Sequence, residues 1–69
     1  MQIKSITQIG KNLIYKHYGI RIKDPDKLFI ISACGRLFLD YTDVLMGYIS
    51  QPITNEFYSE LKQHIKFKK

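Results

Sequence analysis

The sequence predicts a small all-α protein, a three-helix bundle with helices over residues 3–18, 25–49 and 54–66. Three observations predict it: apolar residues at helical spacing near the start, a helix-start signal before residue 25, and a polar stripe through the apolar middle. The alternative is an α+β fold with a β-hairpin at residues 28–41, and the choice depends on how that middle segment is interpreted.

The first helix is predicted from Ile3, Ile6, Ile9 and Leu13, which recur at spacings of three and four residues. Polar side chains occupy the opposite side of this segment. The Tyr18-Gly19 step is a typical helix stop, because glycine adopts the left-handed conformation that ends many helices.

The second helix is predicted to begin at Asp24-Pro25-Asp26. The Asp24 side chain can accept hydrogen bonds from the free amides of a first turn, and proline suits the first helical position. Asp26 adds a negative charge at the positive end of the helix dipole. A helix is therefore expected from residue 25 onwards.

The segment "LFIISACGRLFLDY" could be two strands joined at a glycine-containing turn or one buried helix. Neither "LFII" nor "LFL" alternates apolar with polar, so both strands of a hairpin would have to be covered on both faces. Polar or small residues instead recur three or four apart, which favours a helix over 25–49, continuous or broken near Gly35 or at Tyr41-Thr42. These residues are Ser32, Arg36, Asp40, Asp43, Gly47 and Ser50.

The third helix is predicted after Pro52, which disfavours helical backbone in the residue before it. Thr54 is a suitable N-cap, and Phe57, Leu61 and Ile65 form one apolar face over residues 54–66.

The length and composition indicate a single domain, residues 1–69, with a small core. Cys34 is the only cysteine, so an intrachain disulfide is excluded and a reducing, cytoplasmic setting is expected. No apolar run approaches the length of a membrane span, so no membrane partner is expected. A homodimer or a bound partner would supply the stability that so short a chain lacks.

The charge is strongly segregated along the chain, whose net charge is +5. Residues 1–23 carry five cations and no acid, residues 24–60 carry two cations and six acids, and residues 61–69 carry four cations and no acid. Basic surfaces of this kind bind phosphates. The candidate contacts to the phosphate backbone of a nucleic acid are Lys11, Lys16, Arg21, Lys23, Lys62, Lys66, Lys68 and Lys69.

Two functions are therefore expected. The leading one is a small non-enzymatic regulatory protein that binds DNA or RNA through its basic ends. The alternative is an inhibitor or adaptor, of the kind that mobile elements encode, which docks on a larger acidic protein through its apolar centre. The candidate interface residues are Phe29, Ile31, Phe38, Leu39 and Met46.

No catalytic site, metal site or cofactor is predicted. Cys34 falls on the apolar side of the predicted central helix, where a cysteine usually acts as a small hydrophobic residue. His17 and His64 are the only imidazoles, and they form no closely spaced ligand pair with each other or with Cys34. Asp40 and Asp43 lie one turn apart on the predicted helix and could orient a divalent cation, but two solvated carboxylates are the usual explanation of such a pair. The chain is also short for enclosing a substrate pocket. We therefore expect a binding protein and not an enzyme.

Overall fold

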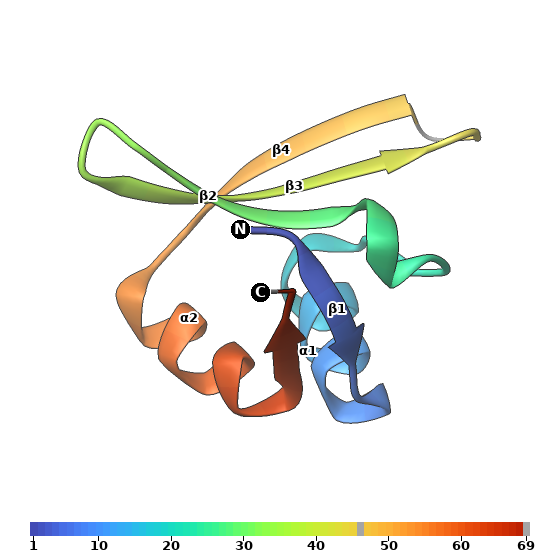
Figure 1. The fold of residues 1–69 in the computed structure, drawn as a ribbon, viewed down its shortest axis with the longest axis horizontal. Coiled ribbons are helices and arrows are strands. Elements are labelled where there is room, and N and C mark those ends of the chain that lie inside the picture. The colour runs from blue at the N-terminus through green and yellow to red at the C-terminus, as the bar shows by residue number, and fades with distance from the viewer. Residues whose placement is uncertain (46, 69) are drawn as a thin grey trace.

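The computed structural model describes residues 1–45 and 47–68 and has an α+β fold with two antiparallel sheets (Figure 1). The predicted all-α three-helix bundle is therefore wrong, and the alternative α+β fold is the one observed. The elements follow in the order β1 (Ile3–Ile6), α1 (Gln8–Tyr18), a 3-10 turn η1 (Pro25–Lys27), β2 (Leu28–Ala33), β3 (Arg36–Asp43), β4 (Gly47–Ile53), α2 (Asn55–Leu61), a 3-10 turn η2 (Lys62–His64) and β5 (Ile65–Phe67).

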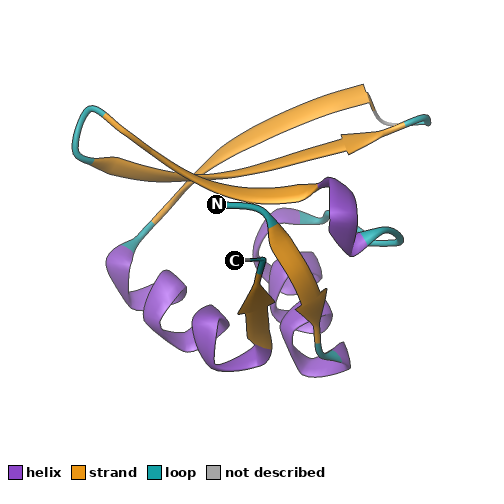
Figure 2. Cartoon of the chain, viewed as in Figure 1, coloured by secondary structure: helices purple, strands orange, loops and turns teal. Residues whose placement is uncertain are grey.

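The larger sheet is a meander with strand order β2-β3-β4, and the smaller one pairs β1 with β5. Both helices and the small sheet lie on the same side of the β2-β3-β4 sheet (Figure 2). A single antiparallel bridge, between Gln2 and Phe29, connects the start of β1 to β2. The chain thus forms one layered structure in which the large sheet is the top layer.

The segment predicted as the central helix, 25–49, is mostly a β-hairpin. Strand β2 pairs with β3 in register from Leu28 opposite Tyr41 to Ala33 opposite Arg36. The two residues between the strands, Cys34 and Gly35, have φ angles of 54° and 74°. Positive φ at both positions defines the type I′ turn, whose twist matches that of the flanking strands.

The helical interpretation of this hairpin fails because a spacing of four residues is compatible with the period of a helix and also with the period of a strand. Residues four apart share a face of a helix, but they also share a face of a strand. Arg36 and Asp40 lie on the same side of β3 for this reason. The strands do not alternate, because apolar residues occupy both of their faces.

The local capping signals predict some of the helix ends correctly, but the predicted helices are too long. Helix α1 ends at Gly19, with a φ of 71°, as predicted, but it begins only after Thr7, whose hydroxyl accepts a hydrogen bond from the Gly10 amide. Residues 3–6 form a strand instead, because they pair with β5. The Asp24 cap starts only the 3-10 turn η1.

Helix α2 has the predicted N-cap, since the Thr54 hydroxyl accepts a hydrogen bond from the Phe57 amide at 3.1 Å. The helix ends at Leu61, and the remainder of the predicted helix 54–66 is η2 and the first part of β5. The α-helices are 11 and seven residues long, and within the described chain no helix is long and apolar enough to cross a membrane.

The hydrophobic core lies between the large sheet and the layer below it. Its fully buried side chains include Ile3, Ile14, Leu28, Leu39 and Leu61, contributed by both sheets and both helices. Tyr41 is also buried, with 1% of its surface exposed. Its hydroxyl accepts hydrogen bonds from the amides of Lys23 and Asp24, which fixes the segment after α1 against β3.

Replacing Cys34 with asparagine is predicted to raise the free energy of unfolding by about 1 kcal/mol, because asparagine tolerates positive φ and Asn-Gly is the preferred type I′ pair. Chemical denaturation measures the change. Cys34→Ser is the matched control, since it removes the thiol without favouring positive φ. If the two variants unfold at the same denaturant concentration, the turn assignment is wrong.

Candidate functional site

The side of the β2-β3-β4 sheet that faces away from the core is the candidate site, and we call it the outer face. Side chains alternate between the two sides of a strand, so the core residues Leu28, Leu39 and Tyr41 fix which residues point outwards. In Figure 1 the helices and the small sheet lie on the opposite side of the sheet. The outer face consists of Phe29, Ile31, Ala33, Arg36, Phe38, Asp40, Thr42, Tyr48, Ser50 and Pro52.

Apolar side chains dominate this face. Cross-strand pairing places Phe38 between Ile31 on β2 and Pro52 on β4, which gives an apolar row across the whole sheet. Phe29 and Ile31 are 37% and 38% exposed, and Tyr48 is 67% exposed. Phe38 between them is half-buried, and an apolar row of this kind is a candidate for contact with another surface.

The residues that follow β3 lie beside the segment after α1, since Val44 and Leu45 line a pocket with Lys23. Val44 and Leu45 are the most exposed large apolar residues, at 90% and 84%. The turn is held by a hydrogen bond from the Leu45 amide to the Asp43 carboxylate at 2.7 Å. Val44 and Leu45 are therefore exposed apolar side chains that lie apart from the outer face.

A single carboxylate, that of Asp40, lies within the apolar surface. Its side chain is opposite Phe29 on one strand and Ser50 on the other, and the residue is only 7% exposed. The hydroxyls of Tyr48 and Ser50 donate hydrogen bonds to its two oxygens, at 2.6 and 2.7 Å. These bonds fix the direction of the carboxylate and leave lone pairs on both oxygens for a further donor.

The hydrogen bond between Tyr48 and Asp40 changes the acidity of the tyrosine. Donation to the carboxylate stabilises the protonated phenol and raises the pKa of Tyr48 above 10.0; the negative charge of Asp40 also contributes. The hydrogen bond holds the Tyr48 hydroxyl as a donor towards Asp40.

Three of the five predicted interface residues lie together on the outer face, namely Phe29, Ile31 and Phe38. Leu39 does not, because it points into the core and is fully buried. Met46 lies outside the described residues. Tyr48, Pro52 and Asp40 were missed, although the absence of alternation in β2 and β3 was the signal that both faces of these strands carry apolar side chains.

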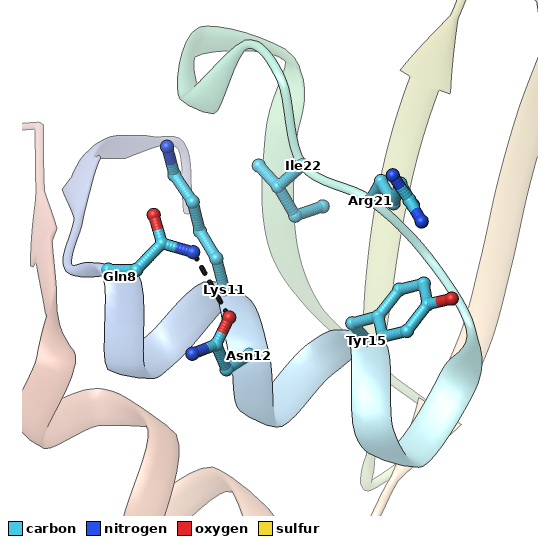
Figure 3. Close-up of a pocket in the computed structure, with 6 residues that line it drawn as sticks. All are labelled: Gln8, Lys11, Asn12, Tyr15, Arg21 and Ile22. Carbon is cyan, nitrogen blue, oxygen red and sulfur yellow. Dashed lines mark hydrogen bonds between the residues drawn. The ribbon is translucent and has the colours of Figure 1, made fainter.

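The predicted basic residues are divided between two parts of the molecule. Lys11 and Arg21 line an open cavity of about 330 Å³ (Figure 3). All six of its lining residues come from α1 and the segment after it: Gln8, Lys11, Asn12, Tyr15, Arg21 and Ile22. The Arg21 guanidinium carbon lies 5.2 Å from the centre of the Tyr15 ring, and Gln8 donates a hydrogen bond to Asn12. Such a cavity can accommodate an anionic group.

The remaining predicted cations lie elsewhere on the surface. Lys16 is exposed on α1, and Lys23 lies two residues after Arg21. Lys62 and Lys66 belong to η2 and β5, with the Lys62 ammonium 5.8 Å from the centre of the Tyr58 ring. Lys68 forms an ion pair with Asp26 at 3.3 Å. Lys69 lies outside the described residues.

The thiol and the potential metal ligands are not arranged as a site. Cys34 is exposed at the hairpin turn, so its expected place on the apolar side of a helix is wrong. Among residues 1–45 and 47–68, no three His, Cys, Asp or Glu side chains come together as a metal-binding group.

Comparisons of this chain with protein-family models, with curated proteins and with solved structures give no match. The function is therefore inferred from the geometry of the outer face and of the cavity lined by Lys11 and Arg21, which we call the basic cavity.

Replacing Asp40 with asparagine is predicted to lower the pKa of Tyr48 towards 10.0, because a hydrogen bond to a neutral amide is weaker than one to a carboxylate. In the native protein the raised pKa makes the contribution of Tyr48 to stability complete below the ordinary pKa, and that contribution is lost as the pH rises through the raised value. Ultraviolet titration measures the pKa, with Tyr48→Phe identifying the signal, and chemical denaturation at a series of pH values measures the stability. Identical Tyr48 titrations with and without Asp40 would contradict the role of this bond.

Proposed function

We propose that this chain is a non-enzymatic protein-binding module, an inhibitor or adaptor that docks on a larger protein through the outer face. The observation that carries the proposal is the gathering of Phe29, Ile31 and Phe38 on a sheet surface with no described element over it. A protein partner is the usual cover for an apolar surface of this kind.

The composition of the outer face supports protein binding. Aromatic side chains are enriched in the buried centres of interfaces, where a few of them contribute most of the binding free energy. Phe29, Phe38 and Tyr48 supply three here. Their burial contributes roughly 25 cal/mol for each Å² of apolar surface removed from water. Asp40 supplies the directional polar contact that fixes the orientation of a partner.

The partner we propose carries an apolar patch with acidic surroundings. The net charge of +5 accelerates the approach of an acidic protein and acts against a basic one. Both helices and β1 remain free in such a complex, because they lie on the other side of the sheet. The basic surface around α1 thus increases the rate of encounter while the outer face makes the contact.

A second candidate function is binding of a nucleic acid phosphate backbone, and the basic cavity favours it. Lys11 and Arg21 line one cavity with an aromatic ring and two amide side chains (Figure 3). Phosphates bind to cations of this kind, and exposed rings beside cations stack on bases. The cavity is separate from the outer face, so variants at each surface distinguish the two functions.

Replacing Phe38 with serine is predicted to weaken binding of the protein partner at least tenfold, because it removes the centre of the apolar row. The partner is isolated from an extract of the native host, before and after nuclease treatment, and its affinity is then measured by calorimetry with the purified protein. Ile9→Ser is the matched control, since Ile9 is 59% exposed on α1, away from the outer face.

The rival function is tested in the same assay with the double variant Lys11→Glu and Arg21→Glu. Protein binding lost by Phe38→Ser and retained by the Ile9 variant and after nuclease treatment would support the proposal. If Phe38→Ser binds the partner as tightly as the native chain, the proposal fails. The second function would instead be established if the native chain binds DNA or RNA at low salt and only the charge-reversed variant loses this binding.

A further inference from the structure

The charges on the outer face form a self-complementary pattern about its centre. Phe38 is the third residue of the central strand, and Arg36 and Asp40 lie two residues before and after it on the same face. At about 3.4 Å per residue, each charge is roughly 7 Å along the strand from Phe38, in opposite directions. A second copy turned by 180° about an axis along the apolar row therefore places arginine opposite aspartate twice.

From this pattern we infer that the partner in contact with the outer face can be a second copy of the chain. The two sheets pack face to face with antiparallel central strands, as the two layers of a β-sandwich do. The row Ile31, Phe38 and Pro52 lies on the two-fold axis and meets its own symmetry copy. The inference rests on the proposed function, because it takes the outer face to be a contact surface, which the second copy occupies when the larger partner is absent.

The geometry of Asp40 fits this arrangement. Packed sheets lie about 10 Å apart, a gap that an arginine side chain spans to reach a carboxylate on the facing sheet. Asp40 is nearly buried and is oriented by two hydroxyl donors. Arg36 is exposed, and neither residue forms an ion pair within the described chain. The second copy thus supplies the cation that this carboxylate lacks.

The charges also select one of the two possible two-fold arrangements. With the axis along the strands, the central strands would run parallel and Asp40 would face Asp40 of the second copy. Like charges placed opposite one another disfavour that contact. With the axis across the strands, both charges are matched. Of these two arrangements, the antiparallel one is therefore compatible with the charges of the outer face.

The size of the face sets the expected strength of the dimer. Because the axis passes through Phe38, the copies overlap over about five residues of three strands about 4.8 Å apart, which is on the order of 250 Å² of sheet per copy and below the size of standard specific interfaces. Because this area is small and both copies carry a net charge of +5, only a weak dimer is expected. The dimer thus forms and dissociates readily, which leaves the face available to another protein.

Sedimentation velocity over a wide range of concentration tests the inference, with a thiol reductant present because Cys34 is exposed. The native chain should pass from monomer to dimer. Arg36→Asp, which places acid opposite acid, should raise the dissociation constant at least tenfold. Lys27→Asp is the matched control, with the same change of charge at an exposed residue outside the face, and should not alter it.

The decisive arm mixes two variants. Arg36→Asp and Asp40→Lys should each be monomeric alone, whereas their mixture should dimerise, because the mixed pair restores one attractive contact and keeps the native one. If Asp40→Lys does not fold, as circular dichroism would show, the comparison of Arg36→Asp with Lys27→Asp decides alone.

The remaining outcomes overturn the inference in distinguishable ways. If the chain stays monomeric at all concentrations, the proposed dimer is refuted. The proposed function still holds in that case if Phe38→Ser weakens binding of the larger protein partner. A dimer that is weakened by Phe38→Ser but not by Arg36→Asp refutes the antiparallel arrangement. A dimer that neither substitution affects uses another surface.

Discussion

The structure depends on one constraint, which is that β3 is the central strand of a three-stranded sheet with a layer on one side only. Its inward side chains, Leu39 and Tyr41, are buried in the core between the sheet and the helices. Its outward side chains, Phe38 and Asp40, have no described layer above them. The hairpin turn, the register of β4 and the path of the chain into α2 all follow from pairing on both edges of this strand.

The outer face follows directly from this arrangement. A sheet exposed to water on one side normally alternates apolar and polar residues, whereas β2 and β3 carry Phe29, Ile31 and Phe38 on the exposed side. Selection for stability of the isolated chain would not place these side chains there. A short chain has little core to stabilise it, and covering the outer face adds apolar burial without lengthening the chain. The proposed function and the stability of the chain would thus be coupled through the same surface.

The sequence contains the local signals of this fold but not its long-range pairing. Thr54 as an N-cap and Gly19 as a helix end depend on residues close in the chain, and both were predicted. Strand β1 could not be predicted in this way, because it is a strand only through its pairing with β5, some sixty residues away. Along β3, the four-residue spacing of Arg36 and Asp40 fits both a helix and a strand. The site was predicted in part, since non-alternation identifies Phe29, Ile31 and Phe38 but not Tyr48, which reaches Asp40 only across the sheet.

The account's central claim is that the outer face is a contact surface, and its first testable contact is a second copy. Amide NMR spectra recorded over a dilution series test this most directly, because they report every described strand and helix separately. The predicted result is a set of concentration-dependent shifts at β2, β3 and β4, greatest around Phe38, with α1 unchanged. Spectra that do not depend on concentration, or shifts confined to α1 and the basic cavity, would contradict it.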